Sequence, residues 1–290
     1  MREGGILYHD RLTPFIIHES DVSGRVVRLG ATVDAILRRH DYPLAVSNLL
    51  AELLVVAAIL SSNLKHEGIV TLQMKGNGPI PMMVADAVYG GVIRGYAEVR
   101  GEVIGASPRA LLGDNAYLAI TLDADAGERY QGVVELEGES IVDALNAYFR
   151  NSQQLDVAFK LATGRDDAGA WKAGGAMIER LPTAKSDSEE SLESWRYAQV
   201  MLQTLKSEEL LDTELDVQDL LYRLYHEQGV VAYDARPITT QCRCSRERIH
   251  KLLLSMPEED RRYALVDGKV SVHCQFCNTA QEFTPEQLSL

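Results

Sequence analysis

Cysteine is scarce in this chain and is confined to one end of it. Only four of the 290 residues are cysteine, and all four fall in the last fifth of the sequence: Cys242, Cys244, Cys274 and Cys277. A secreted protein of this length would be expected to carry paired cysteines throughout its body, whereas clustering at metal-ligand spacing suits a reducing compartment. The scarcity argues against a disulfide-stapled scaffold and predicts a cytoplasmic protein.

Segments that direct a chain to or through a membrane are also lacking. The first residues show no basic stretch followed by an apolar core and a small-residue cleavage site, so we expect no signal peptide. The longest apolar run, Leu53 to Leu60, is too short to cross a bilayer. Together these absences predict a soluble protein without a membrane partner.

Positive charge is in deficit. The 29 Lys and Arg residues face 42 Asp and Glu residues, which gives a formal net charge of −13, and no segment is strongly basic. Because neutralisation of phosphates supplies most non-specific nucleic-acid binding, this balance disfavours nucleic acid as a partner. The hydrophobic fraction of 46% is otherwise that of a globular protein with room for one large core and a smaller appendage.

Motifs of the common enzyme classes are absent or incomplete. The run Asp123-x-Asp125-x-Gly127 resembles the start of a calcium loop, but Val134 stands where the loop requires glutamate, so we interpret it as a polar turn. The stretch Gly76-Asn77-Gly78 lacks a third glycine and a following helix, and no Walker lysine motif occurs. A nucleophile elbow at residues 105–108 lacks its second glycine. We therefore expect a protein that is not an enzyme.

The first 180 residues have the hydrophobic patterns of a mixed α and β domain. Residues 44–64 are dominated by alanine and leucine and predict a long, mostly buried helix. Alternation at 70–75, followed by the turn residues 76–79, predicts a hairpin. Partial segregation of strands and helices favours an α+β fold with a mostly antiparallel sheet. Further strand patterns lie at 80–88, 91–99, 117–122, 130–136, 156–162 and 173–181, and a helix is predicted at 140–149.

The composition changes at residues 181–235, which we interpret as an acidic helical linker. A polar run at 182–190 has little to bury, and residues 191–227 then show leucines at helical spacing with acidic residues on the opposite face. Such an amphipathic segment must dock its apolar face against another surface. The chain is thereby divided into an N-terminal domain of residues 1–180, the linker, and a C-terminal unit of residues 236–290.

The C-terminal unit carries the motif with the clearest chemistry. Cys-x-Cys is followed after 29 residues by Cys-x2-Cys. Zinc prefers four soft ligands at tetrahedral angles, and two close cysteine pairs supply them, so we expect Cys242, Cys244, Cys274 and Cys277 to bind one zinc ion as thiolates. A unit of about fifty residues has a small core, and metal binding would add to its folding free energy. His250 and His273 are expected to be ordinary helix and strand residues.

Local signals suggest how the two cysteine pairs are brought together. Ser245 is the predicted N-cap of a short helix whose inward residues are Ile249, Leu252, Leu253 and Leu254, and Pro257 opens a second helical turn. Asp267-Gly268 is then the predicted turn of a hairpin that runs from 263 to 273 and delivers the second pair.

Spacing alone leaves open whether the zinc is a permanent structural element. Most four-cysteine sites are closed and inert. Here, however, Cys242 and Cys244 are separated by one residue, and Arg243, Arg246 and Arg248 place positive charge beside them, which favours reactive thiolates. If oxidation removed a pair of thiolates as a disulfide, the zinc and its folding contribution would be lost together.

Several segments resemble the redox-regulated thirty-three-kilodalton heat-shock chaperone family. They are residues 226–230 (His-Glu-Gln-Gly-Val), 242–248 (Cys-Arg-Cys-Ser-Arg-Glu-Arg), 273–277 (His-Cys-Gln-Phe-Cys), 148–154 and 173–177. The resemblance extends over essentially the full length, with the cysteine spacing as its most specific part. One departure is Gln153, where the family segment usually carries glutamate.

This resemblance implies an ATP-independent holdase that is silent when reduced and zinc-bound. It further implies that oxidation pairs Cys242 with Cys244 and Cys274 with Cys277, the second pair first. Zinc would then leave, the linker would loosen, and an apolar surface would become available to unfolding client proteins. A homodimer, especially in the active state, is also implied.

Two other classes remain open from the sequence. A zinc-ribbon nucleic-acid binder is weakened by the charge balance. A thiol-disulfide oxidoreductase using Cys274 and Cys277 would need one low-pKa thiol and a thioredoxin-like βαβ context near the Cys-x2-Cys motif. These cysteines are instead predicted to follow a hairpin and to have partner cysteines about thirty residues upstream.

Overall fold

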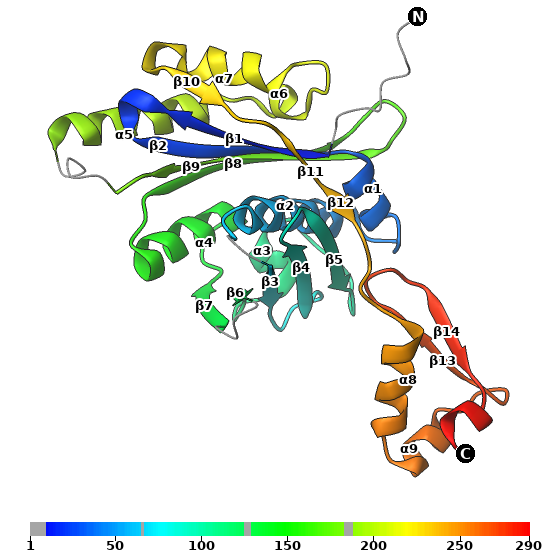
Figure 1. Cartoon of the computed structure of the whole chain (residues 1–290). Coiled ribbons are helices and arrows are strands. Elements are labelled where there is room, and N and C mark those ends of the chain that lie inside the picture. Colours follow the sequence, from blue (N-terminus) through cyan, green and yellow to red (C-terminus); the bar gives the residue numbers. More distant parts are fainter. Residues whose placement is uncertain (1–9, 65–66, 125–128, 183–187) are drawn as a thin grey trace, which may run out of the picture. The chain divides into compact units, whose positions relative to one another are not determined.

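The computed structural model describes residues 10–64, 67–124, 129–182 and 188–290 (Figure 1). They form two compact units, one ending at Thr240 and one spanning Gln241–Leu290. The extreme N-terminus, part of the candidate calcium loop and residues 183–187 of the polar run lie outside the described residues. The expectations made for these segments therefore remain predictions.

Two sheets form the framework of the first unit. One has the strand order β10-β1-β2-β9-β8, with β11 also paired to β1, and the other has the order β12-β5-β4-β3-β6-β7. All strand pairs are antiparallel except β12 with β5. The first sheet contains β1 (Arg11–Ile17), β2 (Val22–Leu29), β8 (Val157–Arg165), β9 (Trp171–Arg180), β10 (Val230–Ala232) and β11 (Arg236–Pro237). The second contains β3 (Gly68–Lys75), β4 (Met82–Val88), β5 (Val92–Glu98), β6 (Tyr117–Ala124), β7 (Arg129–Glu135) and β12 (Thr239–Thr240).

The long helix α2 (Leu44–Ser61) lies between the two sheets and contacts strands of both (Figure 1). It is apolar on almost every side because both of its faces are covered. Close approach to β9 depends on Gly175, where a Cβ would lie 2.4 Å from Cγ1 of Val55. The predicted buried helix, the hairpin of β3 and β4, and the mostly antiparallel α+β fold are confirmed.

One expectation about α2 needs correction. The apolar segment is not limited to Leu53–Leu60, because the helix has 18 residues and by length and composition alone could cross a membrane. However, 78% of that window is buried inside the protein. A core helix packed between two sheets accounts for this hydrophobicity.

The second face of the β10-β1-β2-β9-β8 sheet is covered by the helices predicted within residues 191–227. These are α5 (Glu189–Gln203), α6 (Ser207–Leu211) and α7 (Val217–Tyr225), followed by the 3₁₀ turn η3 (His226–Gln228). Figure 1 shows them on the side of the sheet opposite α2. Alternate strand residues therefore face two different cores, which explains why these strands are apolar on both sides.

Some elements of the first unit carry no clear sequence signal or differ from the expectation. The strands β1 and β2, the turn η1 (His18–Ser20) and the helices α1 (Ala31–Leu37) and α3 (Pro108–Leu112) were not predicted. The helix expected at 140–149 is α4 (Ile141–Tyr148), which begins with a capping box at Ser140 and continues as the π-helical turn η2 (Phe149–Gln153). Arg11–Leu29 alternates weakly because both strand faces are buried.

The second unit contains two helices, a hairpin and a small core. Its elements are α8 (Arg246–Ser255), α9 (Glu258–Tyr263), β13 (Val270–His273), β14 (Ala280–Phe283) and the 3₁₀ turn η4 (Glu286–Leu288). Only four hydrophobic side chains form its buried cluster: Leu253, Val270, Phe283 and Leu288. Such a core is too small to give a unit of this size much stability by itself.

Two local expectations for the second unit are wrong. The predicted Asp267-Gly268 turn is present and is closed by a bridge between Val266 and Lys269, but the hairpin does not extend back to residue 263, because Tyr263 ends α9 and β13 pairs with β14. Leu252 and Leu254 do not point inward, since they are 65% and 38% exposed. The N-cap Ser245 is confirmed, because its hydroxyl accepts a hydrogen bond from the backbone N–H of Arg248.

Candidate metal centre

The four cysteines lie on two short loops of the second unit. Cys242 and Cys244 lie just before α8, where the backbone N–H of Cys244 donates to Sγ of Cys242 at 3.5 Å. Cys274 and Cys277 lie in the loop that joins β13 to β14. That loop is a tight turn, in which the N–H of Asn278 donates to the carbonyl of Cys274 at 2.7 Å and Asn278 adopts a left-handed conformation. The second cysteine pair is therefore within the hairpin loop.

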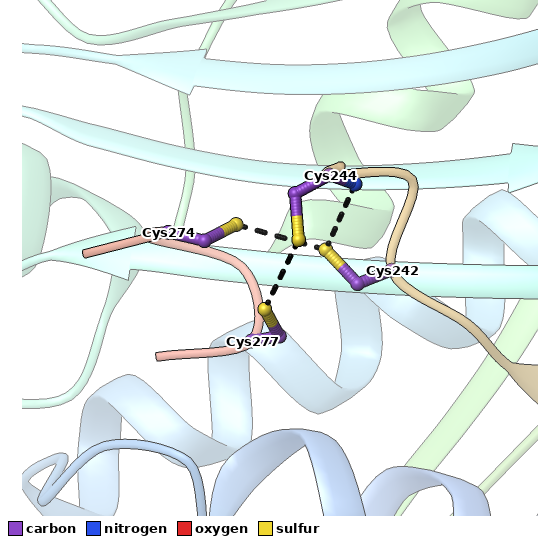
Figure 2. A group of neighbouring side chains, drawn as sticks. All are labelled: Cys242, Cys244, Cys274 and Cys277. Atoms are coloured by element: carbon purple, nitrogen blue, oxygen red, sulfur yellow. Dashed lines mark hydrogen bonds between the residues drawn. The ribbon is translucent and has the colours of Figure 1, made fainter. Parts of the chain in front are cut away.

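The four sulfur atoms converge on one point (Figure 2). All lie within 4.8 Å of one another, with 3.6 Å between Sγ of Cys242 and Cys274 and 3.5 Å between Sγ of Cys244 and Cys277. All four are free thiols. Sulfur ligands at about 2.3 Å from a tetrahedral zinc ion are separated by about 3.8 Å. The cluster can hold a metal ion, and its donor set and spacing fit zinc.

Hydrogen bonds and burial shift the pKa values of three of the thiols in different directions. Burial acts to raise the pKa of Cys277, but hydrogen bonds from the Thr279 side chain and backbone, and from Cys244 and Cys242, lower it to about 6. The pKa of Cys274 is raised by burial, which outweighs the backbone N–H groups of Cys277 and Phe276. The hydrogen bond with Cys242, and then burial, raise the pKa of Cys244. Negative charge therefore settles on Cys277 before Cys274 and Cys244, and a divalent cation would offset charge on all four cysteines.

Arginines were expected to favour thiolates at Cys242 and Cys244, but the pKa of Cys244 is raised, and Arg246 and Arg248 make their contacts elsewhere. The Arg246 guanidinium lies 4.4 Å from the ring centroid of Phe283 and donates to the carbonyl of Glu282 at 2.7 Å. Arg248 donates to the carbonyl of Arg243 at 3.0 Å. Both side chains therefore brace α8 and its flanking loops. Thr279 was missed by the sequence analysis, although a hydroxyl residue two positions after a cysteine is a recognisable local donor.

Neither histidine in this unit belongs to the cluster. His273 is exposed on β13, and Nε2 of His250 lies 2.7 Å from the carbonyl of Gln287. The His250 ring also stacks on Phe283, with centroids 5.7 Å apart. The four thiols remain as the candidate ligand set in the second unit.

A second feature of functional interest is the apolar sheet face beneath α5, α6 and α7. Its strand residues form one buried cluster with the helices. On the strands these are Phe15, Ile17, Val22, Val26, Ala158, Ala162, Ala176 and Ile178, and on the helical segment they include Trp195, Ala198, Leu202, Leu210, Leu220, Leu221, Leu224 and Tyr225. We call the strand part the covered face. The amphipathic segment predicted to need a docking surface finds it here.

Polar contacts fasten the helices over the covered face. The Arg28 guanidinium on β2 donates to the backbone carbonyls of Glu209, Leu210 and Leu215, at 2.9 Å for the first two. The hydroxyl of Tyr225 donates to the carbonyl of Ala198 at 3.2 Å and ties α7 to α5. The carbonyls of Glu209 and Leu210 belong to the last turn of α6, where carbonyls have no partner within the helix, so Arg28 caps this end only when α6 is folded.

Comparison with known proteins gives consistent matches along the chain. The family model described as Hsp33 protein matches residues 10–284. The 33 kDa chaperonin of Photorhabdus laumondii is 37% identical over 281 residues, which cover 97% of this chain and 95% of the relative. The 33 kDa chaperonin of Escherichia coli K12 is 36% identical over 270 residues, 93% and 90% of the two chains.

A solved structure has the same fold. The crystal structure of a 33 kDa chaperonin (heat shock protein 33 homologue) from Thermotoga maritima superposes with a TM-score of 0.84 over 97% of each chain, at 24% sequence identity. At this identity the match speaks for the fold alone.

Proposed function

Since the chain belongs to the Hsp33 family, we propose that it is an ATP-independent chaperone whose activity is switched on by oxidation. Family membership supports a chaperone role, which implies binding of unfolded client proteins. Control by oxidation is supported by one observation: four free thiols lie within 4.8 Å of one another in a unit with a very small core. Any change at the thiols must then affect the folding of the whole unit.

In the reduced state, we propose, one zinc ion per chain is bound by Cys242, Cys244, Cys274 and Cys277. When bound, the metal supplies a crosslink between the loop before α8 and the loop of the β13–β14 hairpin. The backbone N–H groups and the Thr279 hydroxyl that donate to Cys274 and Cys277 would stabilise these sulfurs as thiolates. The unit's four-residue hydrophobic cluster would otherwise leave its two halves weakly joined.

Oxidation removes the thiolates in pairs. Two thiols and one peroxide molecule give one disulfide and two water molecules, so each pair loses two electrons and two protons to the oxidant. The proposed pairs are Cys242 with Cys244 and Cys274 with Cys277. The shortest printed sulfur contacts join the two loops instead, Cys242 to Cys274 and Cys244 to Cys277. Since all four sulfurs lie within 4.8 Å of one another, the proposed pairs are also within reach, and the zinc ion leaves as they form.

We propose that the client-binding surface includes the covered face. Its eight apolar strand residues would form a continuous hydrophobic surface if α5, α6 and α7 moved away, and surfaces of that kind mark sites for protein binding. In this proposal residues 1–180 are the chaperone core, 181–235 the linker that covers it, and 236–290 the redox switch. Its partners are unfolded proteins and a second copy of the chain, and its location is the cytoplasm.

The two alternative functions fit the described structure less well. The Cys-x2-Cys motif lies in the loop of an antiparallel hairpin rather than between a strand and a helix of a βαβ unit, which is the context of thioredoxin-like reductases. The net charge of −13 disfavours a zinc-ribbon nucleic-acid binder. We therefore propose a binding protein rather than an enzyme.

The proposal is tested by aggregation of a thermally unfolding protein in the absence of nucleotide. Chain treated with peroxide at raised temperature is expected to suppress light scattering at about equimolar ratio, whereas the reduced, zinc-loaded chain is not. Peptide mapping of the active form is expected to find the Cys242–Cys244 and Cys274–Cys277 disulfides, with new protease sites between about 181 and 290. Equal suppression of aggregation by the reduced chain would contradict redox control. Catalytic turnover of disulfides in a coupled reductase assay would favour the oxidoreductase.

A further inference from the structure

A hollow opens in the first unit at the C-terminal end of α2. Its walls come from the last turn of α2, the turn between β4 and β5, the start of β1 and the segment 236–238. Its volume of about 230 Å³ is the space of about eight water molecules. Recessed sites of this kind, with an apolar lining and few polar groups, are typical of small-molecule binding.

The inner wall of the hollow is apolar. Leu12, Ala58 and Ile238 line it and are only 3%, 2% and 3% exposed, since they belong to the large core between the two sheets. The Leu64 and Tyr89 side chains continue this lining towards the solvent, and Tyr89 is 46% exposed. Replacing water against such a wall by hydrocarbon is favourable. The inner part of the hollow therefore suits an apolar tail.

One charged side chain lines the hollow, and no carboxylate does. This side chain is Arg236, which is exposed, and among the described residues its guanidinium has neither an ion-pair nor a hydrogen-bond partner. The two lining serines offer no competing protons, because the hydroxyls of Ser61 and Ser62 donate to carbonyls of their own helix at 2.9 and 2.7 Å. The guanidinium N–H groups are thus available to an anion at the mouth of the hollow.

A second guanidinium raises the positive potential at this mouth. Leu12 lies opposite Arg236, and Pro14 lies opposite Arg25, so both arginines project to the same face of the sheet. Burial lowers the pKa of Arg25, and the charge of Arg236 lowers it further, although Glu179 raises it in part. Glu179 is already paired with Arg25 at 3.5 Å. An incoming anion would offset the repulsion between the two arginines.

We propose that this hollow binds one free medium-chain carboxylate, with its tail against Leu12, Ala58 and Ile238 and its carboxylate on Arg236. The two ends of the site select this chemistry together. The buried apolar wall disfavours a wholly polar anion such as phosphate, and the unpaired cation favours a charged ligand over a neutral one. The space of about eight water molecules suits a tail of about seven carbons.

The proposed ligand contacts a segment that joins the two sheets. The backbone N–H of Ile238 donates to the carbonyl of Asp10 at 2.8 Å, and that of Thr239 donates to the carbonyl of Gly91 at 2.9 Å. Figure 1 shows this segment running from β11 to β12, past α2. Neither the thiol cluster nor the covered face contributes to the hollow's walls, so the inference does not depend on the proposed function.

Calorimetric titration of the reduced, zinc-loaded full-length chain with octanoate tests the site. One octanoate per chain is expected to bind with a dissociation constant on the order of 0.1–1 mM. Hexanoate has two methylene groups fewer and is expected to bind at least about tenfold more weakly. Octan-1-ol keeps the tail but lacks the charge, and we expect it to bind about tenfold more weakly as well.

Variants at the two ends of the hollow separate the contributions of charge and tail. Arg236→Gln is expected to weaken octanoate binding about tenfold and to leave octan-1-ol binding unchanged, because only the carboxylate uses the guanidinium. Ala58→Leu fills the hollow and is expected to remove binding of both probes. Arg196→Gln on α5 is the matched control, since Arg196 is exposed and does not line the hollow. Circular dichroism checks that the variants fold.

Each outcome decides the proposal. A full-length chain that binds no octanoate overturns it. If a chain lacking residues 2–8 then binds octanoate, the hollow takes the chain's own apolar residues Ile6, Leu7 and Tyr8 instead. Equal weakening of both probes by Arg236→Gln, or equal effects of Arg236→Gln and Arg196→Gln on octanoate, places binding elsewhere and also overturns the proposal. Aggregation assays are separate, because they can fail while octanoate binds as expected.

Discussion

Replacing Cys277 with serine is expected to abolish tight zinc binding and to unfold residues 241–290 while the first unit stays folded. Hydrogen bonds from Thr279 and from Cys244 and Cys242 lower the pKa of Cys277 to about 6, and its sulfur lies 3.5 Å from that of Cys244. A serine hydroxyl is a poor zinc ligand, and even loss of groups outside the ligand shell weakens metal sites by about 10- to 100-fold, so loss of a ligand should exceed about 100-fold. Structural zinc sites contribute about 10–16 kcal/mol, far more than the small core of this unit.

Competition with a chromophoric chelator measures the zinc affinity, and limited proteolysis reports whether the second unit is folded. Leu252→Ser on α8 is the matched control, because it introduces the same side chain at a position that is 65% exposed and distant from the ligands in sequence. A Cys277→Ser chain that keeps parent-like zinc affinity would contradict the four-thiolate site. If the variant lost zinc but stayed protected from protease, the metal would not be the main stabiliser of the unit.

Replacing Leu224 with aspartate is expected to make the chain active as a chaperone without oxidant. Leu224 is 2% exposed and packs in the cluster that joins α7 to the covered face. Loss of a buried leucine costs about 2–5 kcal/mol, and a carboxylate in its place must also be desolvated or reach water. About 3 kcal/mol is enough to raise the population of the open state more than 100-fold. The helices should therefore detach and uncover the sheet face.

The matched control is Tyr222→Asp, two positions earlier on the same helix and 65% exposed. It adds the same charge to the same acidic segment without touching the covered face. The readouts are suppression of aggregation by the reduced, zinc-loaded proteins and protease cleavage within residues 188–228. Equal behaviour of the two variants would show that charge in the segment, and not uncovering of the sheet, determines activity. If the Leu224→Asp chain were inactive although its helices were cleaved, the covered face would not be part of the client-binding surface.

The sequence predicted the parts of this structure that local pattern determines. Residues 44–61 read as a buried helix because nearly every side chain is apolar, and the hairpin of β3 and β4 is marked by alternation and a glycine-rich turn. The four cysteines were recognisable as a ligand set from spacing alone, and the structure brings all four together. The amphipathic segment 191–227 was correctly expected to be helical and to dock.

The missed features depend on contacts between distant residues. β1 and β2 are buried on one face by α2 and on the other by α5, α6 and α7, which lie more than a hundred residues away, so they show no clear alternation. Cys274 and Cys277 were expected to follow a hairpin of residues 263–273, because Asp267-Gly268 is a good turn signal. In the structure β13 pairs with β14, so the two cysteines lie in the loop between these strands. Likewise, the arginines beside Cys242 contact backbone carbonyls and Phe283, which spacing cannot reveal.

The central claim is that loss of the metal and appearance of chaperone activity are one event. The most direct measurement follows zinc release, with a chromophoric indicator, and suppression of aggregation in aliquots of the same peroxide time course. The account predicts release of one zinc ion per chain and a rise in suppression with the same or a slightly later half-time, both reversed by reductant and zinc. Full suppression before any zinc is released, or complete release that leaves the chain inactive, would contradict it.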